Sequence, residues 1–256
     1  MKVMLAFARK EFTEQLRSGR MLILIILFVI LGVMNPAIAK LTPWVFEMLS
    51  DSLAENGLTV AKITVDAATS WTQFFKNIPV GLIVFVLLQS SIFTKEYQSG
   101  TLVMALTRGL SRCKIVIAKA SLLSLLWSVC CWITFAITYG YNEYYWDNSI
   151  LHNLVLSGIG LWLLGLWVVI VTVFFGVLVK SNTSVLMGTG GVFLVSYLVG
   201  MLPGLQKYTP STLMRTAALH AGNDSIPLYC TAMIVTAVLC AVLLVVSIPI
   251  FNKKSL

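Results

Sequence analysis

Six long apolar segments restrict the fold of this 256-residue chain more than any other feature of its sequence. About 20 apolar residues in a helix cross the hydrocarbon core of a bilayer, and only helices and closed barrels satisfy their backbone hydrogen bonds there. We therefore predict an all-α polytopic membrane protein, with residues 1–256 forming a single transmembrane domain. The predicted spans are approximately Met21–Ala39, Ile78–Thr94, Ile115–Tyr139, Leu154–Val179, Val185–Leu202 and Leu228–Phe251.

Charge is scarce and unevenly placed along the sequence. Only 11% of the residues are charged, against about 25% in a typical soluble domain. Of the 18 Lys and Arg residues, 13 lie near the N-terminus, in residues 95–119, at Lys180 or in the C-terminal tail. Because cytoplasmic loops are enriched in Lys and Arg, both termini and residues 95–119 are predicted to be cytoplasmic. This sidedness also explains the net charge of +8, so no nucleic-acid partner is expected.

The first 20 residues have the pattern of an amphipathic helix. Leu5, Ala8, Phe12 and Leu16 recur at helical spacing, and basic residues occupy the other faces. Lys10 is also placed to pair with Glu14 one turn later. A basic amphipathic helix that leads into a span typically lies in the membrane interface, so residues 1–20 are predicted to lie at the cytoplasmic surface.

The predicted outer loops also contain helical patterns. Residues 41–77 hold two of them, one stopped by Gly57 and one running over residues 60–75. In a later loop, Thr209 is a candidate N-cap with Pro210 at the first helical position. We expect short helices in both loops.

The sequence offers no obvious catalytic or metal centre. Its two histidines, His152 and His220, lie in predicted outer loops, and no Asp or Glu falls clearly within a span. Intramembrane carboxylates usually mark proton relays and ion-coupled transport. The phosphate-binding pattern GxxxxGK[ST] is also missing. No catalytic residue, metal site or cofactor is therefore predicted for this chain.

The fifth predicted span contains two pairs of small residues. Ser184 and Gly188 form one pair, and Ser196 and Gly200 form the other. Small residues four positions apart allow helices to approach closely in membranes. We predict close helix packing here, which includes the possibility of a seam with a second subunit.

The polar segment 95–114 separates the second and third spans. Ser99 and Gly100 indicate a turn, residues 101–106 suit a short apolar helix, and Ser111 is a natural N-cap for the third span. The predicted helix would lie parallel to the membrane, with its cytoplasmic side edged by Glu96, Arg108, Arg112 and Lys114. Such a segment could dock on a soluble partner, or it could be a basic loop that only fixes topology.

This segment resembles the loop after the second span of type-2 ABC-transporter permeases, an exporter class with six spans per subunit. Residues 10–20 similarly resemble the N-terminal elbow helix of that family. Val103, Gly109 and Ala118 depart from the family pattern. The matching residues are Glu96, Ser99, Gly100, Thr101, Leu102, Leu106, Ser111, Arg112 and Lys119 in the loop, and Lys10, Glu11, Phe12, Arg17 and Arg20 in the elbow.

The resemblance implies a permease that has no ATPase site of its own. Such a permease pairs with a second permease, identical or different, and with two ATPase subunits that bind ATP and Mg. The short helix would then be a coupling helix seated in a groove of the ATPase. By this resemblance, Glu96, Gly100, Thr101 and Arg112 would serve coupling, and Leu102 and Leu106 would form the apolar docking face. A bacterial plasma membrane is the expected location.

The substrate is less well specified by the sequence. Apolar spans without charge suit an amphipathic or hydrophobic cargo such as a peptide, a lipid or a drug, and the family resemblance favours antimicrobial-peptide export or immunity. Two alternatives remain at this point. A substrate-binding subunit of an importer would not be expected to carry the elbow and the coupling loop. An intramembrane enzyme would need Ser, His or Asp side chains that converge inside the spans.

Overall fold

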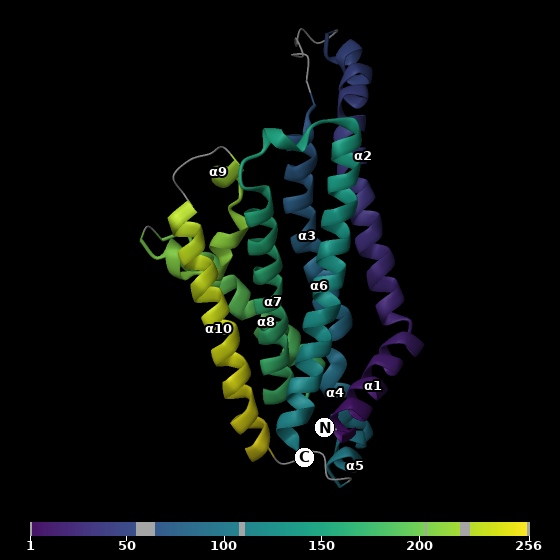
Figure 1. The fold of residues 1–256 in the computed structure, drawn as a ribbon, viewed down its shortest axis with the longest axis vertical. Coiled ribbons are helices and arrows are strands. Elements are labelled where there is room, and N and C mark those ends of the chain that lie inside the picture. Colours follow the sequence, from purple (N-terminus) through teal and green to yellow (C-terminus); the bar gives the residue numbers. More distant parts are fainter. Residues whose placement is uncertain (1, 55–64, 108–110, 203, 221–225, 255–256) are drawn as a thin grey trace.

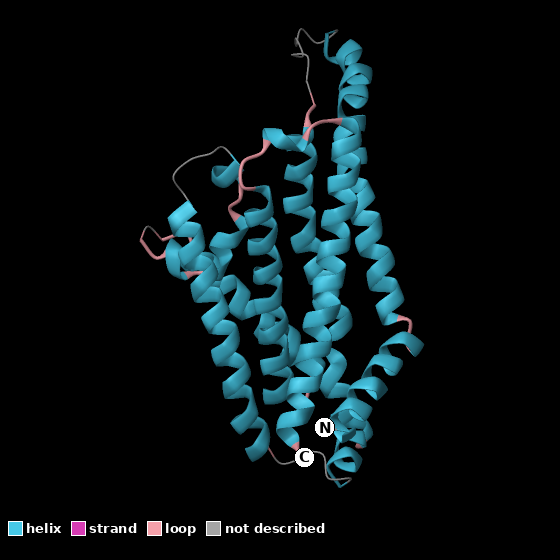
Figure 2. Ribbon diagram, in the orientation of Figure 1, coloured by secondary structure: helices cyan, strands magenta, loops and turns pink. Residues whose placement is uncertain are grey.

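The computed structural model describes residues 2–54, 65–107, 111–202, 204–220 and 226–254. Every regular element in these residues is helical (Figure 2). The α-helices are α1 (Lys2–Arg17), α2 (Arg20–Ala54), α3 (Ala67–Gln89), α4 (Ser91–Ser99), α5 (Thr101–Thr107), α6 (Arg112–Tyr145), α7 (Leu154–Leu178), α8 (Asn182–Val199), α9 (Ala217–His220) and α10 (Ile226–Lys253).

Six of these segments are long and apolar enough to cross a membrane, as predicted. The second is longer than expected, because α3 and α4 together form an apolar segment from Ala67 to Ser99. The turn between the fourth and fifth spans is as tight as predicted, since α7 ends at Leu178 and α8 begins at Asn182.

The first span is where the sequence-based boundary was wrong. A span ending at Ala39 and a separate outer helix were predicted, but α2 runs without interruption to Ala54, through Pro36 and Pro43. A proline deprives the carbonyl four residues earlier of its helical donor. For Pro36 that carbonyl is Gly32, and it accepts a hydrogen bond from the Thr138 hydroxyl of α6 at 3.1 Å. The neighbouring helix thus makes the proline tolerable, as is common inside membranes.

The spans form two adjoining groups (Figure 1). In one, α2 packs against α3 and α6; in the other, α10 and α8 pack against α7, while α6 and α7 join the two groups. Trp127 of α6 lies at this junction, fully buried between Phe28 and Phe85. Its indole N–H donates to the Trp162 carbonyl at 2.9 Å, so a large side chain fixes the contact between the groups.

Both ends of the described chain lie at the same end of the bundle, which we call the proximal end (Figure 1). The helix α1 crosses the bundle obliquely there. The opposite, distal end is extended by the last turns of α2 and carries three short 3₁₀ segments, Asn148–Ile150, Gln206–Tyr208 and Pro210–Met214.

The helix predicted after Thr209 is present in a modified form. Thr209 occupies the N-cap position and Pro210 the first turn, but the segment is 3₁₀-helical, and the α-helix α9 follows it only at Ala217. The predicted stop at Gly222 lies outside the described residues. The start of the helix predicted over residues 60–75 also lies outside the described residues, and its later part belongs to α3.

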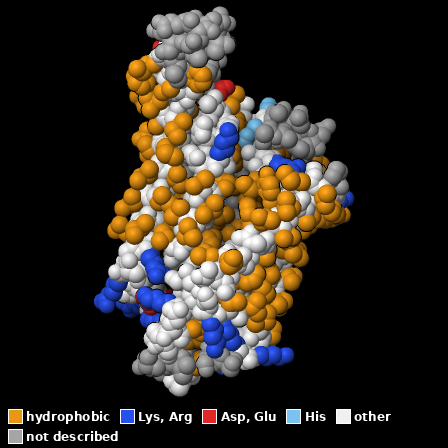
Figure 3. All heavy atoms as spheres, turned by 180° about the vertical axis from the view of Figure 1, so that it is seen from behind, with side chains coloured by type: hydrophobic (Ala, Val, Ile, Leu, Met, Phe, Trp, Pro, Cys, Tyr) orange, Lys and Arg blue, Asp and Glu red, His pale blue; other side chains and the backbone are white. Residues whose placement is uncertain are grey.

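The molecular surface separates apolar and basic regions (Figure 3). Apolar side chains cover most of the bundle, and Lys and Arg gather mainly towards the proximal end in this view. Exposed apolar residues such as Ile26, Ile83 and Val245 lie on the outer faces of the spans. This surface suits contact with lipid rather than water.

Candidate functional site

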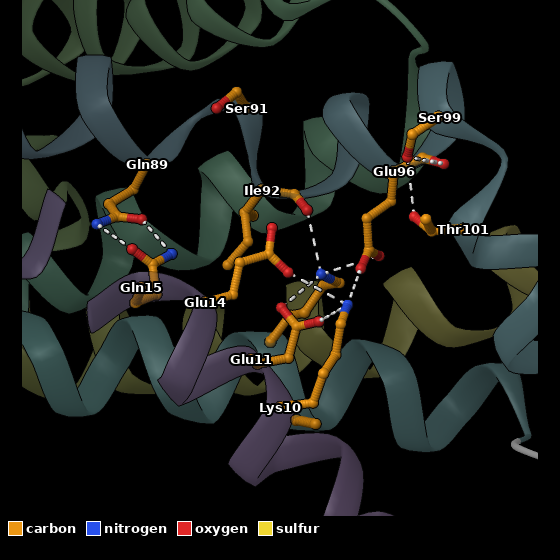
Figure 4. Close-up of polar contacts among 12 residues, drawn as sticks. Lys10, Glu11, Glu14, Gln15, Gln89, Ser91, Ile92, Glu96, Ser99 and Thr101 are labelled. Atoms are coloured by element: carbon orange, nitrogen blue, oxygen red, sulfur yellow. Dashed lines mark hydrogen bonds and ion pairs between the residues drawn. The ribbon is translucent and has the colours of Figure 1, made fainter. Parts of the chain in front are cut away.

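Four charged side chains from three helices form a closed ring of contacts at the proximal end (Figure 4). Lys10 and Glu11 come from α1, Glu96 from α4 and Lys119 from α6. The Lys10 ammonium lies 3.1 Å from Glu11 Oε1 and 2.9 Å from Glu96 Oε1. The Lys119 ammonium lies 2.8 Å from Glu11 Oε2 and 3.0 Å from Glu96 Oε2. We call these four residues the ion-pair ring.

The ring is mostly buried. The side chain of Lys119 is 1% exposed, and its third ammonium contact is a hydrogen bond to the Ile92 carbonyl at 3.1 Å. Lys119 thus donates hydrogen bonds to Glu11 Oε2 and to the Ile92 carbonyl, whereas its contact with Glu96 Oε2 is an ion pair without a hydrogen bond. Taking one member out of a buried ion pair typically costs about 3–5 kcal/mol. The ring therefore joins α1, α4 and α6 firmly.

Lys10 closes the ring on its solvent side. It is half exposed and also lies 3.3 Å from Glu14, the predicted i,i+4 partner. Partial burial lowers the pKa of Lys10, but the hydrogen bonds to Glu96 and Glu11 and the attraction of their carboxylates raise it above its ordinary value. Lys10 consequently stays charged at any physiological pH.

The helix α1 presents its polar face to the protein and its apolar stripe outward. Glu11 and Gln15 are buried, whereas Phe12 and Leu16 are 39% and 49% exposed. Gln15 forms a side-chain amide pair with Gln89, with N···O distances of 2.9 and 3.3 Å. This orientation is the reverse of a soluble amphipathic helix, and it is the one expected where lipid surrounds the protein.

The ring lies one turn before the predicted turn of segment 95–114. Gly100 follows α4 with φ of +67°, a left-handed conformation that glycine adopts without strain. The Ser99 and Thr101 hydroxyls are 2.9 Å apart across this turn. The short helix predicted over residues 101–106 follows as α5. Glu96 thus fixes the chain immediately before α5.

The side chains of this segment are placed differently from expectation. Glu96, expected on the exposed edge, is buried in the ring. Leu102 is 1% exposed and belongs to the protein's own core, and Leu106 packs partly against that core. Leu102 therefore anchors α5 to the bundle instead of facing outward. Arg108, another predicted edge residue, lies outside the described residues.

Arg112 holds the other end of the segment. One of its guanidinium nitrogens donates to the carbonyls of Phe251, Asn252 and Lys254 at 2.7, 3.2 and 2.6 Å. The last carbonyls of a helix lack helical donors and carry partial negative charge. Arg112 therefore caps the C-terminal end of α10 and ties the start of α6 to it.

Oxygen atoms of Glu11, Glu14 and Glu96 lie within 4.8 Å of one another, close enough to share a cation. Two ammonium groups, those of Lys10 and Lys119, already lie against them. The chain's own ammonium groups thus already offset two of these three negative charges.

One feature of the sequence indicated that a buried ion pair should exist. Lys119 falls inside the predicted third span, and a charge within a span implies a partner. The partner itself could not be read from the sequence, because Glu11 is 108 positions away. Of the ring, Glu96, Glu11 and Lys10 were named as site residues, but their association was not predicted.

The small residues of α8 make close contacts with neighbouring elements of the same chain. A side chain at Gly188 would collide with the Phe175 ring of α7, and one at Gly200 with the Ser211 hydroxyl. The carbonyl of buried Ser196 accepts a hydrogen bond from Ser211 at 2.8 Å. Ser184, by contrast, is exposed.

A Ser–His contact is present at the distal end, where His220 Nε2 lies 3.0 Å from the Ser157 hydroxyl. Ser157 donates its own proton to the Asn153 carbonyl at 3.0 Å. Which of the two atoms donates depends on the tautomer of the His220 ring, and the contact joins α9 to the start of α7.

The comparisons with known proteins agree with this architecture. A family model described as "ABC-2 family transporter protein" matches residues 5–256. No curated protein matches the chain.

Proposed function

Because this chain belongs to the ABC-2 family of transporter proteins, it is the membrane permease subunit of an ABC transporter, and we propose that it exports its substrate through force received at α5. A separate ATPase subunit would bind ATP and Mg and press on segment 95–112 from the cytoplasm. A second permease, identical or different, would complete the path. The proximal end would then be cytoplasmic, in agreement with its excess of Lys and Arg.

One observation carries this proposal: the residues that flank α5 in the sequence are bound to three separate parts of the bundle. Glu96, just before α5, is bound through the ion-pair ring to α1 and to α6. Arg112, just after it, is bound to the end of α10. A displacement of α5 would therefore move α1, α6 and α10 together. A loop that only fixed topology would not require a buried attachment at one end and three hydrogen bonds to carbonyls at the other.

The residues of the segment take distinct parts in this mechanism. Glu96, Arg112 and Leu102 are positioning residues that hold α5 against the bundle. Gly100 and Thr101 form the turn that sets the direction of α5. The surface that meets the ATPase would be formed by the exposed residues of α4 and α5, with Gln98 and Ser99 among them.

We propose an amphipathic or hydrophobic substrate, such as a peptide, a lipid or a drug, with an antimicrobial peptide preferred. This part rests on the apolar character of the spans and on the family resemblance. An importer's substrate-binding subunit has no need of the attachments described above. An intramembrane enzyme has no support from the family match, which is to a transporter protein.

Affinity purification of the tagged chain in mild detergent, followed by identification of the co-purifying chains, tests the proposal. An ATPase subunit should be recovered, and its hydrolysis rate should rise when the permease is present. Gly100→Pro should abolish this stimulation, because proline cannot adopt the positive φ of Gly100.

The matched control is Gly140→Pro, because Gly140 lies in the distal part of α6. It tests whether a proline anywhere in the chain would abolish the stimulation of ATP hydrolysis. A second control, Gly100→Ala, adds a Cβ into open space, so only the strain of the positive φ remains; it should retain part of the stimulation. Recovery of the chain without any ATPase, or unaltered stimulation by Gly100→Pro, would contradict the proposal.

A further inference from the structure

Two arginines of α1 lie away from the ion-pair ring and are not used by it. Arg9 and Arg17 are exposed, and their guanidinium groups have no ion pair or hydrogen bond with the part of the chain that the structure describes. They are eight residues apart, which is about 12 Å along a helix. Both line the same open hollow, together with Ala6, Lys10, Thr13, Glu14 and Ser18.

The hollow has a positive lining. Its one carboxylate, Glu14, lies 3.3 Å from the Lys10 ammonium, which also pairs with Glu11 and Glu96 in the ion-pair ring. Apart from Lys10, the two positive charges of Arg9 and Arg17 exceed the single negative charge of Glu14 by one. Guanidinium groups bind phosphate through paired, charge-assisted hydrogen bonds, so the lining is complementary to a phosphate.

Apolar side chains lie beside Arg9. Phe12 and Leu16 are 39% and 49% exposed. At 100° per residue, they are about 60° and 20° from Arg9 around the helix, and about 140° and 100° from Arg17. The face thus combines two adjacent surfaces, one basic and one apolar. An anionic phospholipid has the same two parts, a charged headgroup and acyl chains.

The position of α1 in the chain agrees with such a ligand. The helix ends at Arg17, and α2 begins at Arg20 and enters the first apolar span. Residues at this boundary lie at the level of the headgroups. The hollow is therefore located where lipid phosphates are found.

We propose that an anionic phospholipid binds along α1, with its phosphate between Arg9 and Arg17 and its acyl chains over Phe12 and Leu16. A zwitterionic lipid fits less well, because it carries its own ammonium group. The opposite face of α1 carries Glu11 and Gln15, so this lipid would hold in place the helix that closes the ion-pair ring. The inference does not depend on the proposed function.

Native mass spectrometry of the detergent-purified chain, titrated with dioleoyl-phosphatidylglycerol, tests this directly. Each basic residue near an anionic lipid surface contributes to the binding free energy. The loss of two should weaken binding of the first lipid about 30-fold. The double variant Arg9→Gln/Arg17→Gln should show that loss. The matched control Lys114→Gln/Lys253→Gln removes two exposed cations elsewhere at the proximal end and should weaken binding far less, because neither residue lines the hollow.

Three further arms complete the experiment. Dioleoyl-phosphatidylcholine should bind weakly to every variant, and Arg9→Lys/Arg17→Lys, which keeps the charge, should retain most of the affinity. Free glycerol phosphate should not displace the lipid, since it lacks acyl chains. Equal loss in the control variant, equal binding of phosphatidylcholine or displacement by glycerol phosphate would each overturn the proposal.

Discussion

Replacing Lys119 with methionine isolates the energetic contribution of the ion-pair ring. Lys119 is almost fully buried, and its ammonium neutralises Glu11 at 2.8 Å and Glu96 at 3.0 Å. Lys119→Met leaves these two buried carboxylates with only half-exposed Lys10. We expect a loss of about 3–5 kcal/mol in the free energy of unfolding, the usual cost of an unpaired buried charge.

The assay is unfolding of the purified chain by sodium dodecyl sulfate, followed by circular dichroism. The matched control is Lys95→Met, since Lys95 is exposed on the neighbouring α4 and should change the free energy of unfolding by no more than about 0.5 kcal/mol. Lys119→Met/Glu11→Gln should be less destabilised than Lys119→Met alone, because it removes a charge of each sign. Equal effects of Lys119→Met and Lys95→Met would refute the reasoning.

Three other substitutions test separate parts of the fold. Gly165→Ala should lower the free energy of unfolding by about 1–3 kcal/mol, measured in the same assay, because the added Cβ would lie 2.0 Å from a ring atom of Trp127; no loss would show that this contact is loose. Thr138→Val should cost about 1 kcal/mol, because it removes the donor to the carbonyl freed by Pro36, and a Pro36→Ala background should reduce that cost. Burial lowers the pKa of His220, so the folded chain binds fewer protons than the unfolded chain. The free energy of unfolding should therefore fall as the pH drops below about 6.5. His220→Gln should flatten this part of the stability–pH curve, and an unchanged slope would contradict the attribution to His220.

The six spans could be predicted because the bilayer imposes a length and an apolar composition on each of them. The end of the first span could not. Lys40 and Pro43 are ordinary stop signals, but α2 runs past both of them to Ala54. A tertiary contact accompanies this extension, since the Lys40 ammonium lies 3.7 Å from the centroid of the Tyr145 ring of α6.

The candidate site shows the same division between local and distant information. The turn at Gly100 and the short helix α5 follow from local residue types and were predicted. The burial of Glu96 was not, because its partners Lys10 and Lys119 are more than 20 positions away in sequence. The burial of Leu102 was not predicted either. The outward apolar stripe of α1 also became clear only when the bundle supplied polar partners for its other face.

Photocrosslinking tests the central claim that the exposed residues of α4 and α5 bind the ATPase subunit. Benzoylphenylalanine is placed at exposed Gln98 of α4 or, as a distal control, at Tyr144, which is 81% exposed. The transporter is then irradiated in native membranes and the crosslinked chains are identified. We predict a crosslink to an ATPase subunit from position 98 and none from position 144. A crosslink to the ATPase from position 144, or none from position 98, would contradict the account.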